Sequence, residues 1–220
     1  MQTLEHALAL GIKLRINTVV NGNNVRELEK IAKTILKYQP KAVNFICFND
    51  WVNAGKITGS IGVKYSEASP HIIAAIQTLY PYVPKVTVRY IPFCFMKGYE
   101  KHVCNLGQKD YDWDEWIDSI KRLVTDLSED KRRTYTENIN RIWEVHHEEI
   151  YPKLSVKEKK SVQRMQEGSL FNNFDCSLAS VVHKIENHAL RKSYIHGPQC
   201  KSCAYEKICD GVESSYAEHF

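Results

Sequence analysis

The stretch LRINTVVNGNNVRELEKIAKTILKYQPKAVNFICF, residues 14–48, decides the fold. It opens with a mostly apolar, β-branched run, which indicates a buried strand at 14–20. The turn Asn21-Gly22-Asn23-Asn24 then precedes apolar residues spaced three and four apart, which predict a helix over 25–38. A second apolar run predicts another buried strand at 42–48. We therefore expect a strand, a crossover helix and a parallel strand in succession.

The same alternation continues toward the C-terminus. A helical stripe covers 70–80, and a third strand is predicted at 85–91, ended by Pro92. Three strands with two crossovers are too few to close a barrel, so these residues look like part of something larger. Residues 112–150 carry a long amphipathic helical pattern, and 155–190 are expected to be helical in pieces. The expected fold class is α/β, a partial parallel-sheet (βα) barrel with an α-rich, cysteine-containing C-terminal extension.

Composition restricts the partners that the chain is expected to bind. The 220 residues include 30 basic and 26 acidic ones, and a net charge of +4 is too mild to argue for nucleic acid or an anionic membrane. No apolar stretch approaches the length of a transmembrane helix, and the start has no signal pattern. Seven cysteines, an odd number, without a secretion signal indicate a reducing compartment. We expect a cytoplasmic protein with neither a nucleic-acid nor a membrane partner.

The strongest chemical signal is the motif Cys200-x2-Cys203-x5-Cys209 in a short, turn-rich stretch. Thiolates at this spacing can coordinate one metal centre, and soft sulfur ligands favour zinc or an iron–sulfur cluster. The alternative is a set of buried or unpaired thiols, or a disulfide. The candidates for a fourth ligand are Cys94, which we prefer, and Cys104, His196, Cys176 and Cys47. Coordination by His196 would favour zinc.

The run His146-His147-Glu148-Glu149 also invites a metal interpretation. Adjacent histidines on a helix point in different directions and do not chelate one ion together. We interpret the run as a solvated helical face.

Four stretches resemble a known family. They are INTVVNGNNVRELEKIA (16–32), NFICFNDW (44–51), VTVRYIPFCFMKGYEKHVCN (86–105) and CKSCAYEKICDGV (200–212). The first two resemble late barrel strands of the radical SAM enzymes, the third resembles the start of a SPASM- or twitch-like extension, and the fourth its auxiliary-cluster knuckle. The chain thus resembles the C-terminal half of a radical SAM enzyme.

The resemblance implies a division of the chain and a set of cofactors. Residues 1–92 would be the C-terminal part of the barrel, and 93–220 the extension with a helical insertion and the cysteine knuckle. The knuckle would hold an auxiliary 4Fe-4S cluster, and the complete enzyme would use S-adenosyl-L-methionine (SAM) to modify a peptide or a small metabolite. Asn17 and Asn21 would hydrogen-bond the ribose or carboxylate of SAM, or be satisfied strand-end or turn asparagines.

The sequence also lacks three features of that family. The C-x3-C-x2-C motif that binds the SAM-cleaving cluster is absent, as are the Gly-Gly-Glu-Pro segment and the cysteine that follows the knuckle. We therefore expect a C-terminal part of such an enzyme: a fragment, a split gene or a truncated reading frame. Its partners would be the missing N-terminal half or a reductant protein, and the chain alone should not cleave SAM. The alternatives are a zinc-knuckle binding module without catalysis and a non-functional remnant.

Overall fold

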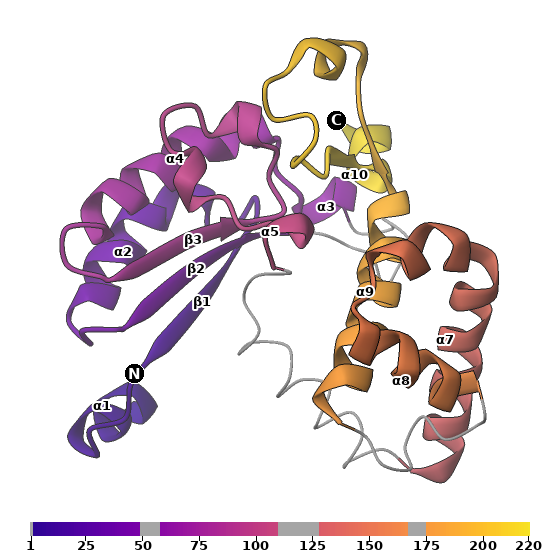
Figure 1. Cartoon of the computed structure of the whole chain (residues 1–220). Coiled ribbons are helices and arrows are strands. Elements are labelled where there is room, and N and C mark those ends of the chain that lie inside the picture. Colours follow the sequence, from indigo (N-terminus) through magenta and orange to yellow (C-terminus); the bar gives the residue numbers. More distant parts are fainter. Residues whose placement is uncertain (1, 49–57, 110–127, 167–174) are drawn as a thin grey trace. The chain divides into compact units, whose positions relative to one another are not determined.

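The computed structural model describes residues 2–48, 58–109, 128–166 and 175–220. The chain forms two compact units (Figure 1). The sheet unit comprises Met1–Gln108 and Tyr194–Phe220, and the helical unit comprises Lys109–Ser193. The knuckle therefore belongs to the same unit as the sheet, although more than eighty residues of sequence separate the two parts. The division after residue 92 separates regions that resemble different parts of the radical SAM enzymes. It is not based on compactness, so these two units do not test it, and it stays a prediction.

The predicted strands form a parallel sheet in the order β1-β2-β3. The strands are β1 (Arg15–Val20), β2 (Ala42–Cys47) and β3 (Lys85–Arg89). Successive residues of a strand point to opposite faces of the sheet. On one face, Val43 and Phe45 of β2 and their neighbours Val86 and Val88 of β3 point into the hydrophobic core. Among the described residues the sheet is open and does not close into a barrel. The α/β class is confirmed.

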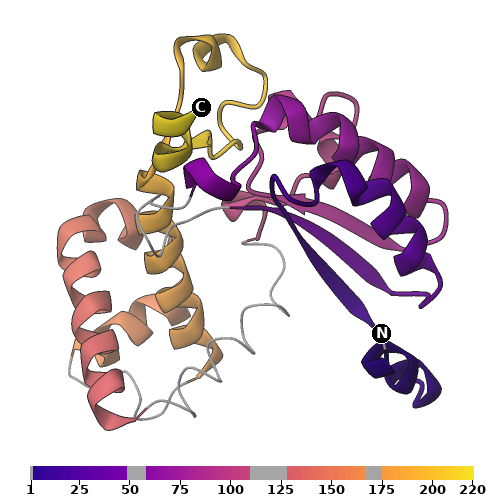
Figure 2. The same cartoon turned by 180° about the vertical axis from the view of Figure 1, so that it is seen from behind.

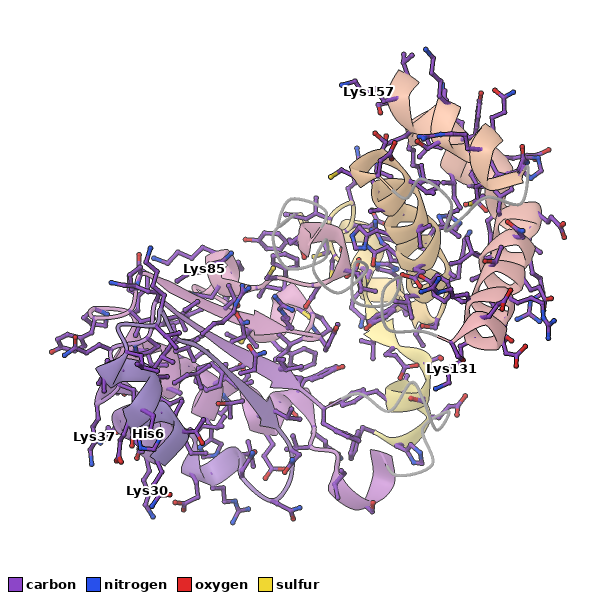
Figure 3. All side chains as sticks on the ribbon, turned by 90° about the horizontal axis from the view of Figure 1, so that it is seen from below. His6, Lys30, Lys37, Lys85, Lys131 and Lys157 are labelled. Atoms are coloured by element: carbon purple, nitrogen blue, oxygen red, sulfur yellow. The ribbon has the colours of Figure 1, made fainter. Side chains whose placement is uncertain are left out.

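Both crossover helices lie on one face of the sheet, as the right-handed crossover rule requires (Figure 2). The helix expected at 25–38 is a 3-10 turn, η1 (Val25–Glu27), followed by α2 (Leu28–Leu36). Lys30 of α2 and Lys37 at its end point to solvent (Figure 3). The buried residues Leu28, Ala32 and Ile35 form the apolar stripe of α2.

The second crossover helix is longer than its pattern predicts. α4 spans Tyr65–Leu79, whereas the sequence pattern predicts a helix that starts at Pro70. Pro70 lies at the sixth helical position, beyond the first turn where proline is well tolerated, so the helix lacks the hydrogen bond that this residue would otherwise donate to the carbonyl oxygen of Ser66. Tyr65 and Ala68, which precede the proline, are buried in the core.

The remaining elements of the sheet unit are short. They are α1 (Gln2–Ala9), α3 (Thr58–Ile61), η2 (Phe93–Phe95), η3 (Glu100–His102), α5 (Leu106–Lys109), β4 (Tyr194–Ile195), η5 (Pro198–Ser202), β5 (Val212–Glu213) and α10 (Ser214–His219).

The helical unit has its own core. Its described elements are α7 (Glu129–Ile150), η4 (Tyr151–Lys153), α8 (Val156–Gln166) and α9 (Cys176–Lys192). Ile139 and Trp143 of α7 pack with Met165 of α8 and Val182 of α9. Lys131 and Lys157 lie on the outside of α7 and α8 (Figure 3). The part of the predicted helical pattern at 112–127 lies outside the described residues.

In the described part of the chain, no helix has both the length and the apolar character needed to cross a bilayer.

Candidate metal centre

The knuckle is the loop that carries Cys200, Cys203 and Cys209, and a short antiparallel sheet joins its two ends. β4 pairs with β5, so that Tyr194 faces Glu213 and Ile195 faces Val212. Gly211 precedes β5 with φ +92°, and a Cβ atom there would lie 2.4 Å from the carbonyl oxygen of Ile195. Only glycine fits this position. The closure brings both ends of the cysteine motif to one place.

Backbone N–H groups inside the loop point at two of its sulfurs. The N–H of Tyr205 donates to Sγ of Cys203, and the N–H of Gly211 donates to Sγ of Cys209, both at 3.4 Å. A tight turn joins the first pair, because the N–H of Cys203 donates to the carbonyl oxygen of Cys200 at 2.9 Å. Hydrogen bonds to sulfur favour the charged thiolate, which is the form that binds metal.

The three knuckle cysteines and Cys94 line one cavity of about 240 Å³. Cys94 comes from a distant part of the sequence, on η2. β3 ends at Arg89, Tyr90 takes a left-handed conformation with φ 59°, and Pro92 then starts the 3-10 turn that carries Cys94. Pro92, Phe93, Phe95 and Val212 supply apolar lining. The arrangement offers four sulfur ligands in a mostly apolar cavity.

The electrostatics agree with this proximity. Burial raises the pKa of the Cys94 thiol, and charge on Cys209, Cys200 and Cys203 raises it further. A bound cation would reverse the effect, since metal coordination deprotonates a thiol. The raised pKa of Cys94 is thus consistent with the other three cysteines lying close to it.

The sulfurs are spaced more widely than a single zinc ion requires. Among the described residues, which include all seven cysteines, no three cysteine sulfurs lie within 4.8 Å of one another. Sulfurs around one zinc ion lie about 3.8 Å apart, as follows from a Zn–S distance of about 2.3 Å. A cluster of several irons takes its thiolates on different metal atoms and spreads them further.

The other candidates for the fourth ligand are placed less well. His196 lines the cavity, but its Nε2 lies 3.1 Å from the carbonyl oxygen of Cys209 and donates to it. Cys104 and Cys47 are not among the residues that line the cavity in the described part of the chain. Cys47 is buried at the end of β2, and burial raises the pKa of its thiol to about 12. Cys176 is exposed on α9, in the helical unit.

Several contacts that the sequence did not indicate fix the knuckle within its unit. The rings of Phe93 and Tyr205 stack with centroids 5.1 Å apart, one residue away from Cys94 and two from Cys203. Gln108 donates to the carbonyl oxygen of Ile208 at 2.7 Å, and the N–H of Gly107 donates to the buried carboxylate of Asp210 at 3.3 Å. The aromatic residue beside each motif was visible in the sequence, but nothing there indicated that the two would meet.

The two asparagines lie at different places on β1. Asn17 is exposed on the face opposite the helices, where its Oδ1 accepts a hydrogen bond from Asn44 at 2.8 Å. Thr87 donates in turn to Asn44, so a polar row crosses the three strands. Asn21 follows the carboxyl end of β1, and its Oδ1 accepts from the N–H of Asn23 at 2.9 Å in an Asx turn. Both side chains thus have structural roles, which leave open an additional contact with a ligand.

Comparison with known proteins gives no match: no family model, no curated protein and no solved structure matches this chain.

Proposed function

We propose that this chain is the C-terminal part of a radical SAM enzyme, and that Cys94, Cys200, Cys203 and Cys209 hold its auxiliary 4Fe-4S cluster. The observation that carries the proposal is the single cavity lined by all four cysteines, next to the turn that follows β3. The family part rests on the sequence resemblance, and the substrate would be a peptide or a small metabolite. A cytoplasmic location and a missing N-terminal half or reductant protein as partner belong to the same proposal.

The chain's own residues would have distinct roles at this centre. The four cysteines would ligate as thiolates, and the N–H groups of Tyr205 and Gly211 would stabilise two of those charges. The stacked rings of Phe93 and Tyr205 would limit the access of water. When bound, such a cluster supplies one-electron transfer or, with one iron open, a binding position for substrate. Asn17 and Asn21 remain our candidates for contacts with SAM.

The preference for an iron–sulfur cluster over zinc rests on the resemblance of the C-x2-C-x5-C knuckle to an auxiliary-cluster motif. The four cysteines that line the cavity suit either a tetrahedral zinc ion or a cluster, so metal analysis has to distinguish the two.

The test is anaerobic reconstitution of the purified full chain with ferrous iron and sulfide. We expect a brown protein with thiolate-to-iron absorbance, about four irons and four sulfides per chain, and an EPR signal after reduction. A colourless protein that takes up one zinc ion and no sulfide would contradict the proposal and support the binding module.

Single cysteine-to-serine variants identify the ligands. Cys200→Ser, Cys203→Ser and Cys209→Ser should each lose most of the bound iron, and Cys94→Ser should do the same or convert the cluster to a less stable form. Cys176→Ser, an exposed position in the helical unit, is the matched control and should keep the wild-type iron content. Equal loss in the control would mean that iron uptake is non-specific.

A further inference from the structure

The helical unit contains a second group of potential metal ligands, unrelated to the cysteines. His146 and Glu149 lie three residues apart on α7, and His188 lies on the neighbouring helix α9. Each offers one ligand atom, and these three atoms all lie within 4.8 Å of one another. The rings of His146 and His188 have centroids 5.0 Å apart. From these contacts we propose that His146, Glu149 and His188 form a site for a divalent transition-metal ion of the zinc type.

The helix geometry explains why these three residues meet. Side chains three apart on a helix share a face, so His146 and Glu149 both point toward α9. His147 occupies the next position, is exposed, and its Nδ1 contacts the carbonyl oxygen of Glu144 at 3.1 Å. The two adjacent histidines therefore do not chelate together, and the partner of His146 comes from another helix.

A buried nitrogen supports a ligand at this position. Nε2 of His188 is buried and has no hydrogen-bond partner among the described residues. Oε2 of Glu149 lies 3.6 Å from this nitrogen, beyond hydrogen-bond distance. The His188 side chain is 13% exposed and that of Glu149 is 51% exposed. The group is thus buried at one end and open to solvent at the other, which gives an ion a route of entry.

The ligand set selects the metal. Two imidazoles and one carboxylate suit zinc and its neighbours in the transition series, whereas calcium and magnesium prefer oxygen ligands alone. Ligands on a tetrahedral zinc ion lie about 3.4 Å apart, given bonds of about 2.1 Å. Side-chain rotations of roughly an ångström would bring the three atoms from their present spacing to that distance. The fourth position would be left to water.

One residue competes with the proposed ion. Lys192, one turn beyond His188 on α9, donates to both oxygens of Glu149 at 3.0 and 2.9 Å. This ion pair is the alternative explanation for the arrangement, because it links the same two helices without a metal. The two explanations predict opposite effects of removing the lysine: a metal site should bind more tightly, and an ion-pair cluster should only lose stability.

The experiment uses the full chain after cluster reconstitution, titrated with Co²⁺ and then with Zn²⁺ in competition. We expect one Co²⁺ per chain with ligand-field bands and no thiolate-to-cobalt charge-transfer band. Cobalt bound by cysteines would show that band in addition to the ligand-field bands, so failure of the cluster and failure of this site give different spectra. Zn²⁺ should displace the cobalt and raise the melting temperature of the helical unit.

Variants decide the assignment. His146→Ala and Glu149→Gln, at half-buried and exposed positions, should weaken Co²⁺ binding at least about tenfold, while His147→Ala leaves it unchanged. Lys192→Met should tighten binding by up to about fivefold, the value of one exposed ion pair. Absence of a sulfur-free cobalt spectrum, equal effects of the variants at His146 and His147, or no gain with Lys192→Met would overturn the proposal.

Discussion

Gly211 is a residue of the proposed centre at which even a methyl group cannot be added without moving the backbone. Its φ of +92° lies in the left-handed region, and an added Cβ would meet the carbonyl oxygen of Ile195 at 2.4 Å. Because its N–H also donates to Cys209, a shift of the backbone here would move a sulfur ligand. The position therefore combines conformational, steric and electrostatic requirements.

We predict that Gly211→Ala reduces the iron content of the reconstituted chain by at least about half and destabilises the sheet unit by roughly 1–3 kcal/mol. Gly98→Ala is the control, since Gly98 has φ +81° but no atom within 4 Å of the added Cβ. It should cost about 1 kcal/mol and leave the iron content unchanged. Iron analysis and thermal unfolding measure both effects. Equal iron loss in the two variants would show that backbone strain, not the contact with Ile195, is responsible.

At the scale of single elements, α8 begins with a capping box that is tied to α9. The N–H of Ser155 donates to Oε2 of Glu158 at 2.7 Å, and the N–H of Glu158 donates back to the Ser155 hydroxyl at 3.4 Å. The same carboxylate, 6% exposed, accepts from Ser180 and Lys184 of α9. Burial raises the pKa of Glu158, but hydrogen bonds from Lys184, Ser180 and Ser155 outweigh this and lower it to about 2.

This lowered pKa makes the helical unit sensitive to acid. The folded unit holds the Glu158 proton less tightly than the unfolded chain does, so the stabilisation is complete above the ordinary pKa of 4.5 and is lost as the pH falls toward 2. We predict that Glu158→Gln lowers stability by about 1–3 kcal/mol at neutral pH and that the difference from wild type shrinks between those two values. Hydrogen exchange of peptides from α8, followed at several pH values, measures this difference in stability. Glu137→Gln, exposed on α7, should have no such effect. A difference that does not change with pH would rule out the ionised carboxylate as its source.

The elements differ in how well their sequence predicts them. The three parallel strands follow from apolar runs, because a strand covered by crossover helices needs little polar sequence. The start of α4 at Tyr65 was not predicted, since Pro70 suggested a first turn and local pattern does not report the burial of Tyr65. The spacing of Cys200, Cys203 and Cys209 predicts a shared metal centre; the three residues line one cavity, and the metal centre itself stays a prediction.

The contacts that could not be predicted join residues far apart in the chain. Phe93 and Tyr205 meet only because β3 and the knuckle belong to one unit. His146 and His188 meet only because α7 packs on α9, and a single helix face gives no sign of a partner. Short-range periodicity specifies which side of an element is apolar, whereas the identity of the residue opposite depends on the whole fold.

For the whole molecule, each unit has its own hydrophobic core and its own candidate metal site. A cluster held by Cys94, Cys200, Cys203 and Cys209 would be ligated fully by protein, so it would have no open iron for the amino and carboxylate groups of SAM. The motif that would leave one iron open, C-x3-C-x2-C, does not occur in this sequence. On the proposed assignment, the residues of this chain would therefore not carry out radical generation.

We accordingly predict that the purified, reconstituted 220-residue chain forms no 5′-deoxyadenosine from SAM under anaerobic conditions with dithionite. Chromatography with mass detection measures the product, and an authentic radical SAM enzyme in the same reagents controls for their activity. Cys94→Ser tests the reason behind the prediction if iron analysis shows that the variant keeps a cluster, because one iron would then be open without the missing residues that bind SAM; it too should give no product. Turnover by the wild-type chain would overturn both its assignment as a C-terminal part and the auxiliary role of the knuckle. Turnover only in the variant would keep the ligand assignment and show that an open iron is the single requirement the wild-type chain lacks.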